Sequence, residues 1–118
     1  MIIAVDYGES WCGLAVSEGS LAEPLKTVPT KNVFEEVDRL KPGKVVVGIS
    51  EGKMARKTLI FVEKLRERVG VPVETVDETL TSHQAEKIKK NKADQHAVAA
   101  ALILDRFLDN IQAICLKT

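Results

Sequence analysis

The sequence has little of several residue types, and each shortage excludes a class of protein. Its two cysteines, Cys12 and Cys115, lie near opposite ends of a 118-residue chain, so the chain has neither a disulfide framework nor a zinc-binding cysteine spacing. Aromatic residues make up only 4% of the chain, and the two histidines, His83 and His96, are too few and too separated to suggest a zinc site. No apolar run is long enough to span a membrane, and no basic leader precedes an apolar segment. We therefore expect a reduced, cytoplasmic protein with no membrane partner.

An excess of charge of one sign is also missing. Seventeen Lys and Arg residues balance seventeen Asp and Glu residues, which gives a formal net charge of +0. The balance does not by itself indicate a nucleic-acid partner, but an acidic site and basic helices elsewhere would cancel in the sum. The apolar share of 45% and the charged share of 29% are ordinary for a globular protein. The length predicts one domain, residues 1–118, with its own core.

Hydrophobic patterning predicts an α/β fold. Ile2–Val5 is a continuous apolar run, typical of a central strand buried on both faces, and the turn around Gly8 predicts an antiparallel strand over Trp11–Val16. Asn32 and Glu35 form a capping-box pair at the start of a helix. The other expected elements are a strand around Glu23–Val28, the helix from Asn32 to Pro42, a strand over Lys44–Ile49, a helix over Lys53–Val69, a strand over Val71–Val76, a short helix from Thr81, a final helix from Asp94, and a short strand or tail over Gln112–Leu116.

This order of elements is that of the ribonuclease H-like fold. It predicts a mixed five-stranded sheet, made of an antiparallel three-strand meander and two parallel strands, with helices on both faces. A right-handed crossover places the strand over Lys44–Ile49 beside the first strand. The carboxyl ends of the parallel strands then meet at one edge of the sheet, where ligands bind in such folds.

Carboxylates stand at the ends of these predicted elements. Asp6 closes the first strand, Asp77 and Glu78 close the last one, and Asp94 opens the final helix. Converging acids are costly unless they are protonated or bound to a cation, and hard oxygen ligands suit Mg²⁺ or Mn²⁺. The pattern favours a metal-dependent phosphoryl-transfer site, above all a nuclease, with Asp6, Glu78 and Asp94 as catalytic metal ligands and Asp77 as a further ligand.

Each acid also has an ordinary structural interpretation. Asp94 is well placed as a helix N-cap, and Asp77 or Glu78 would suit the dipole of the helix that follows. Because neighbouring strand residues point to opposite faces, we expect only one of these two to face the metals. Glu51, after the middle parallel strand, is an alternative second carboxylate, although a solvated turn residue is the simpler interpretation. Asp6 is the hardest to explain structurally, because burial after four apolar residues disfavours its charge.

Basic residues flank the predicted acidic edge. Lys53, Arg56 and Lys57 stand at the start of the second long helix, and Lys92 precedes the final one. These residues are expected to contact a nucleic-acid backbone through its phosphates. The mixed charges over residues 63–68 favour an ordinary solvated helix surface instead.

Three further residues are candidates for contact with the substrate. Tyr7 and Trp11 flank the first turn and are able to stack on a base, although packing within the meander is an alternative for Trp11. His96 follows Asp94 by two residues and is a candidate for assisting proton transfer, with a plain surface histidine as the simpler interpretation.

Several blocks of sequence match a known family in order and spacing. They are Ile3-Ala4-Val5-Asp6-Tyr7-Gly8, Gly13-Leu14-Ala15-Val16, Glu23-Pro24-Leu25, Val45-Val46-Val47-Gly48-Ile49, Val73 through Thr81, and Asp94 with the Ala-rich helix ending Leu102-Ile103-Leu104. On these blocks nearly the whole chain resembles the YqgF family, also called RuvX, of RuvC-like Holliday junction resolvases and pre-16S rRNA processing nucleases.

The resemblance implies a ribonuclease H-like fold and a bacterial, cytoplasmic nuclease that uses a divalent metal in ribosome biogenesis or junction resolution. The first-strand Asp of the family matches Asp6, and its late-helix Asp matches Asp94. Its Asp-Glu-Arg-Leu-Thr-Thr motif matches residues 77–82, with Thr79 where the family has Arg. A guanidinium there would clamp a phosphate, so its absence weakens binding. The loop after Ile49 and the segment between Ser82 and Asp94 are also shorter than in the family.

These departures leave other functions open. One is a non-catalytic module that binds nucleic acid or ribosomes on the same fold. Another is a phosphate-binding, ATPase-like domain, because Asp6-Tyr7-Gly8 followed by Gly13 resembles a strand–turn–strand phosphate cradle, although such proteins use two domains and this chain has room for one. The expected partner is pre-rRNA or branched DNA, and the expected state is a monomer or a homodimer.

Overall fold

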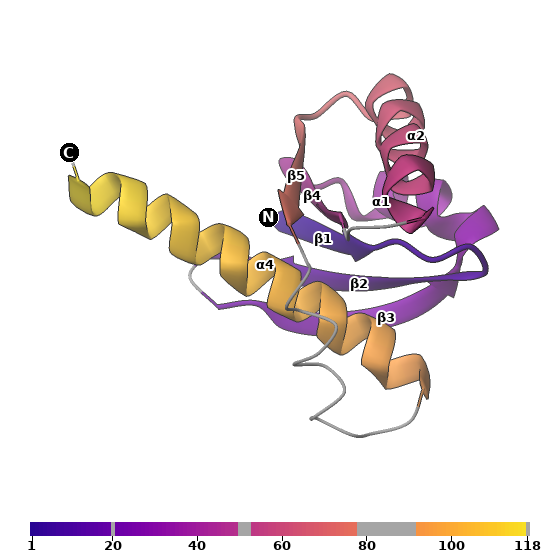
Figure 1. Ribbon diagram of the computed structural model, residues 1–118, viewed down its shortest axis with the longest axis horizontal. Coiled ribbons are helices and arrows are strands. Elements are labelled where there is room, and N and C mark those ends of the chain that lie inside the picture. Colours follow the sequence, from indigo (N-terminus) through magenta and orange to yellow (C-terminus); the bar gives the residue numbers. More distant parts are fainter. Residues whose placement is uncertain (20, 50–52, 78–91, 118) are drawn as a thin grey trace.

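A computed structural model describes residues 1–19, 21–49, 53–77 and 92–117, with side chains described except at 53, 77, 92–95 and 109–117. Five strands form one sheet in the order β3-β2-β1-β4-β5 (Figure 1). The elements are, in chain order, β1 (Ile2–Asp6), β2 (Trp11–Ser17), β3 (Glu23–Pro29), the 3-10 helix η1 (Thr30–Asn32), α1 (Val33–Leu40), β4 (Lys44–Ile49), α2 (Lys53–Arg68), β5 (Val73–Asp77) and α4 (Lys92–Lys117).

The pairing of the strands confirms the predicted topology. Strands β1, β2 and β3 form an antiparallel meander, while β4 lies parallel to β1 and β5 lies parallel to β4. The central position of β1 agrees with its continuous apolar run, since Ile3, Ala4 and Val5 are fully buried. A strand covered on both faces has no solvent side on which to place a polar residue.

Helices cover both faces of the sheet, and each face has its own core. On one face Ile3 and Val5 pack with residues of α1 and α2, among them Val37 and Leu65. On the other face Ala4 packs with the apolar stripe of α4, and Figure 1 shows this helix crossing the meander. Directly opposite Ala4 on β2 lies another alanine, and such small side chains let a helix lie close to a sheet.

The ends of two helices differ from the sequence-based expectation. Asn32 makes no side-chain capping bond, because residues 30–32 form the 3-10 turn η1 instead of a capping box. Helix α4 begins at Lys92, so Asp94 lies in its first turn and is not an N-cap. The helix also continues through residues 112–116, where we expected a strand or a tail, because no Gly or Pro interrupts it. The short helix predicted from Thr81 falls outside the described residues.

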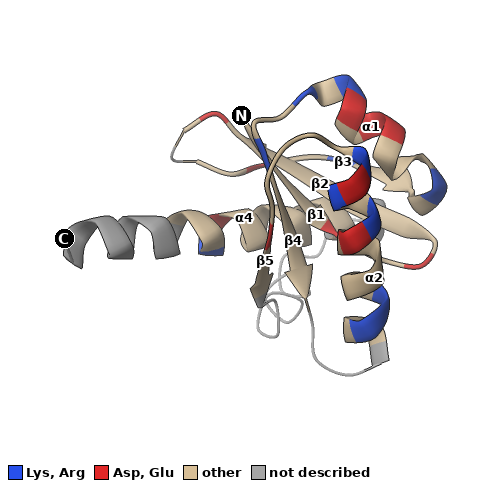
Figure 2. Ribbon diagram, turned by 90° about the horizontal axis from the view of Figure 1, so that it is seen from above, with Lys and Arg blue, Asp and Glu red and all other residues tan. Residues whose placement is uncertain are grey.

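Helix α2 is amphipathic. Phe61, Val62 and Leu65 are buried, whereas Leu59 and Ile60 are each 50% exposed. Basic and acidic segments alternate along the outer side of α2 (Figure 2). Its cations at 66 and 68 pair with acids of α2 and α1, as a solvated helix surface requires. No helix within the described ranges has the length and apolarity to cross a membrane.

Candidate active site

The end of β1 places Asp6 at the edge where the parallel strands finish. Val5 is paired with Val47 of β4, and Ile49 at the end of β4 is paired with Asp77 at the end of β5. The backbones of β1, β4 and β5 therefore end at a common edge, as the crossover rule predicts. The side chain of Asp6 is only 15% exposed. Because Ala4 packs against α4 and strand side chains alternate, Asp6 also lies on the α4 face.

His96 of α4 is the partner of this carboxylate. Its Nδ1 lies 3.4 Å from Oδ2 of Asp6, and the imidazole is 41% exposed. The hydrogen bond to Asp6 raises the pKa of His96 above its usual value, aided by the negative charge and opposed by partial burial. A protonated imidazole thus places a positive charge beside Asp6. The interpretation of His96 as a plain surface histidine is wrong.

A glycine on β2 sets the distance between α4 and the sheet. Gly13 is paired with Asp6 across the antiparallel ladder. A Cβ atom on Gly13 would lie 1.9 Å from the backbone oxygen of His96, which no packed structure tolerates. A glycine inside a strand often marks such a close backbone approach. Gly13 therefore allows the first turns of α4 to bring His96 to Asp6.

Trp11 lies on the same face of β2 as Gly13, two residues earlier in the strand. Its side chain is 51% exposed, so the alternative of packing within the meander is wrong. An exposed indole close to the end of β1 is available for stacking, as expected from the sequence.

The remaining predicted residues are placed less fully. The backbone of Asp77 ends β5 at the edge that carries Asp6, and the backbone of Asp94 lies in the first turn of α4. Arg56 and Lys57 are exposed on α2, and Lys57 pairs with Glu9. The structure does not describe Glu51, Glu78 and Thr79. It describes only the backbone of Lys53, Asp77, Lys92 and Asp94. The described side chains contain no group of three His, Cys, Asp or Glu residues arranged to hold a metal; they bring together Asp6 and His96.

The Asp6–His96 pair gives a direct prediction for titration. In the Asp6→Asn variant the pKa of His96 should fall, since the hydrogen bond and the charge that raise it are removed. Proton NMR of the imidazole against pH measures this in both proteins, with the His83→Gln background used to assign the signal. A pKa of His96 that is equal in the two proteins would contradict the pairing.

The raised pKa of His96 also determines how its contribution to the unfolding free energy changes with pH. Since the pKa of His96 is higher in the folded than in the unfolded chain, the pair stabilises the fold fully below the ordinary histidine pKa of about 6.5. That contribution is lost as the pH rises through the raised pKa. The difference in unfolding free energy between wild type and His96→Gln should therefore shrink between acidic and alkaline pH.

Sequence comparisons identify relatives of this chain. The sequence model of the RuvX family, described as Holliday junction resolvase, matches residues 1–110. A protein of Thermotoga maritima named "Putative pre-16S rRNA nuclease" is 37% identical over 122 residues, which cover 99% of this chain and 53% of that protein. A protein of the same name from a Sulfurihydrogenibium species is 35% identical, over 93% of this chain and 90% of its own. The chain thus spans about half of the Thermotoga protein.

A structural comparison gives the same fold. Thermus thermophilus RuvC, solved in complex with a Holliday junction substrate, superposes with a TM-score of 0.64 at 19% identity, over 94% of this chain and 95% of RuvC. This likeness confirms the predicted ribonuclease H-like fold. Given the family match over nearly its whole length, the chain belongs to the RuvX family.

Proposed function

We propose that this protein is a divalent-metal-dependent nuclease that hydrolyses a phosphodiester bond in structured nucleic acid. The observation that carries the proposal is the Asp6 carboxylate, only 15% exposed at the shared carboxyl edge of three parallel strands and facing the first turns of α4. A strand end of this kind is where ligands bind in open α/β sheets. Membership of the RuvX family supports nucleic acid as the ligand.

The donor set that we propose for this edge would suit Mg²⁺ or Mn²⁺. Carboxylate oxygens are the preferred ligands of both ions, and we propose Asp6, Glu78 and Asp94 as those ligands, with Asp77 as a further one. Bound there, the ions would activate water and stabilise the leaving oxygen.

Described side chains around Asp6 are proposed to complete the site. His96 is the partner of Asp6, and it would become a candidate proton carrier once a cation binds that carboxylate. Trp11 offers a stacking surface on the same face. Arg56, Lys57 and, from their sequence positions, Lys53 and Lys92 are proposed to contact phosphates.

For the substrate we propose pre-16S rRNA first and branched DNA second. The relatives at 37% and 35% identity bear the pre-16S rRNA name, whereas the protein solved with a Holliday junction is only 19% identical to this chain. A four-way junction has a two-fold arrangement and is cut by symmetric dimers, so resolution would require a homodimer. Trimming of an rRNA end requires only one subunit.

Cleavage assays on both substrates test the proposal. Purified protein is incubated with a labelled RNA that extends beyond the 5′ end of 16S rRNA, and separately with a four-way DNA junction, in Mg²⁺, Mn²⁺ or EDTA. We expect incision of the RNA that depends on the metal and is lost in EDTA. Binding of either substrate without incision under any metal would instead assign the chain to a non-catalytic binding module.

A further inference from the structure

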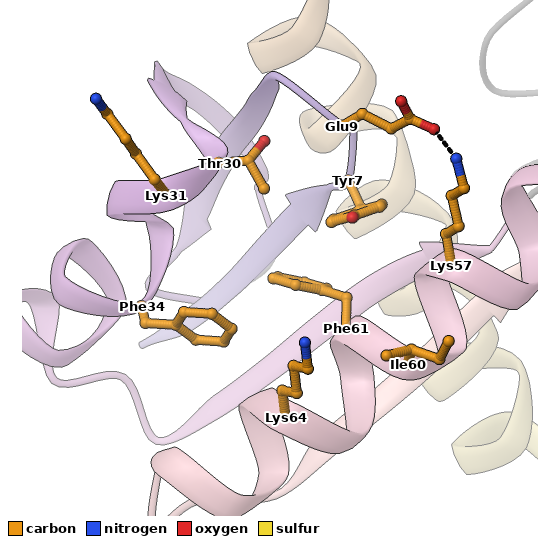
Figure 3. A pocket seen from close by; sticks show the side chains of 9 residues that line it. All are labelled: Tyr7, Glu9, Thr30, Lys31, Phe34, Lys57, Ile60, Phe61 and Lys64. Atoms are coloured by element: carbon orange, nitrogen blue, oxygen red, sulfur yellow. Dashed lines mark hydrogen bonds and ion pairs between the residues drawn. The ribbon is translucent and has the colours of Figure 1, made fainter.

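A pocket of about 270 Å³ lies between η1, α1 and α2, on the face of the sheet opposite α4 (Figure 3). Its floor is aromatic. The ring of Phe61 lies 4.6 Å from that of Tyr7 and 5.5 Å from that of Phe34, measured between centroids. Phe61 is buried, whereas the other two rings are half-buried. Three of the five aromatic residues in the chain thus form one partly open apolar surface.

The rim of this pocket is cationic. Lys57 and Lys64 stand two helical turns apart on α2, about 10 Å along its axis. Lys31 of η1 also lines the pocket, but its ammonium group points away from the rings. Lys57 pairs with Glu9, the one acid among the described residues of the rim. Within the described part of the chain, Lys31 and Lys64 have no ion-pair partner. Three lysines and one glutamate leave the rim positive in a protein whose formal net charge is +0.

Hydrogen bonds hold one wall of the pocket in place. The hydroxyl of Thr30 donates to the carbonyl oxygen of Gly8 at 2.7 Å, and the Thr30 N–H donates to the carbonyl oxygen of Ser10 at 2.9 Å. The turn between β1 and β2 is thereby tied to η1, which carries Lys31. A wall fixed in this way does not need to be ordered when a ligand binds, and that lowers the cost of binding.

We propose that this aromatic pocket binds one unpaired nucleotide of the nucleic-acid substrate, with its base against Tyr7 and Phe34 and its phosphates near Lys57 and Lys64. Aromatic rings beside a positively charged groove are the usual combination for single-stranded nucleic acid. The Lys57–Glu9 pair is solvent-exposed, and such pairs contribute little, so a phosphate can displace Glu9 from Lys57.

The position of the pocket links it to the candidate active site. Tyr7 directly follows Asp6, and their side chains serve opposite faces of the sheet, Tyr7 packing on the α2 side and Asp6 lying beside α4. A strand anchored at Tyr7 would cross the edge of the sheet to present a phosphate to Asp6. The pocket is therefore a site for an unpaired flank next to the cleaved bond. The inference rests on the proposed function in that its ligand is nucleic acid.

Binding measured without metal tests the pocket separately from cleavage. The probes are a fluorescein-labelled twelve-residue oligouridylate and an abasic oligonucleotide of equal length, titrated by anisotropy in EDTA. We expect wild type to bind the oligouridylate at least fivefold more tightly than the abasic strand, because stacking requires a base. Lys64→Glu should weaken binding about tenfold and reduce the salt dependence by the share of one phosphate contact.

Two variants serve as controls. Lys41→Glu makes the same charge change at an exposed lysine beyond the far end of α1, and it should alter the dissociation constant by less than twofold. Tyr7→Leu keeps an apolar side chain against Phe61 but removes the stacking face, so it should abolish the preference for the base-bearing strand. Circular dichroism melting confirms that each variant is folded.

The outcomes separate this inference from the nuclease proposal. Equal losses in Lys64→Glu and Lys41→Glu, or equal affinity for the two strands, would overturn the pocket. A third result would also overturn the pocket. If ultracentrifugation showed a concentration-dependent dimer, and Ile60→Glu dissociated this dimer without changing oligouridylate binding, the pocket would belong to an interface between copies of the chain. If binding depends on the pocket but the protein cleaves neither substrate, the pocket proposal is supported and the nuclease proposal is contradicted. If the protein cleaves its substrate with a KM that Lys64→Glu leaves unchanged, the nuclease proposal is supported and the pocket proposal is contradicted.

Discussion

Replacement of Asp6 by asparagine is expected to reduce metal-dependent cleavage by about a thousandfold or more while leaving the fold intact. A catalytic cation contributes several kcal/mol of transition-state stabilisation, and each 1.36 kcal/mol corresponds to about tenfold in rate. Asparagine has nearly the shape of aspartate but lacks the charge that holds the ion. The measurement is the single-turnover rate on the RNA and junction substrates in Mg²⁺ and Mn²⁺.

The matched control for this variant is Asp38→Asn. Asp38 is an exposed acid of α1 whose carboxylate pairs with Arg68, so the same substitution there should leave the rate within twofold of wild type. The melting temperature of Asp6→Asn should also lie within a few degrees of wild type. The substitution weakens the interaction with His96, but that imidazole is 41% exposed, and exposed ion pairs contribute little to stability. A well-folded Asp6→Asn protein that cleaves at the wild-type rate would contradict the assigned role of Asp6.

The second large effect is expected at Gly13. A methyl group there would lie 1.9 Å from the backbone oxygen of His96 and 2.7 Å from the backbone nitrogen of Ala97. Backbone atoms cannot rotate away, so Gly13→Ala must push α4 off the sheet. We expect a loss of about 3 kcal/mol in unfolding free energy, the upper end for overpacking, and a melting temperature lower by about 10 °C or more. Thermal melts followed by circular dichroism measure both.

Gly19→Ala is the control, since nothing lies within 4 Å of a Cβ atom at that position. It should leave the melting temperature nearly unchanged. Cleavage by Gly13→Ala should fall at temperatures where the variant remains folded, because α4 carries His96 and the proposed ligand Asp94. Equal stability and activity of Gly13→Ala and Gly19→Ala would contradict the claim that the site depends on the close approach of α4 to β2.

Much of the fold follows from local patterns in the sequence. The apolar run of β1 is buried on both faces, and the short turns between β1, β2 and β3 make an antiparallel meander, as predicted. The start of α1 was not predictable in this way. The sequence is compatible with a helix capped by Asn32, but Thr30 is hydrogen-bonded to the β1–β2 turn and residues 30–32 form η1. This tertiary contact decides between a capped helix and a 3-10 turn.

The candidate site was predictable only where one residue carries the signal alone. Asp6 stands out because a carboxylate after a buried strand has no ordinary structural role. The role of His96 depends on the approach of α4 over Gly13, and the one sequence signal for it is a glycine inside a strand. Lys64 was assigned to a solvated helix surface from its charged neighbours. Only the arrangement of η1 against α2 shows that it shares a pocket with Lys31.

We assign different roles to the two faces at this edge of the sheet, cleavage on one and nucleotide binding on the other. Asp6 and His96 lie on the α4 side, where the proposed chemistry occurs, and the aromatic pocket that begins at Tyr7 lies on the α2 side. A chain formally neutral overall thus concentrates positive charge near, but not at, its acidic edge. This arrangement lets a substrate be attracted by lysines without placing them where cations must bind.

The most direct test of the account is where Mn²⁺ binds. Paramagnetic broadening of NMR signals, followed as small amounts of Mn²⁺ are added to wild type and to Asp6→Asn, locates the ion without requiring turnover. The account predicts that the His96 imidazole and the Gly13 amide broaden first in wild type and persist in the variant at the same Mn²⁺ concentration. Equal broadening in the two proteins, or broadening confined to signals remote from Asp6, would contradict the proposal that this edge of the sheet holds the catalytic metal.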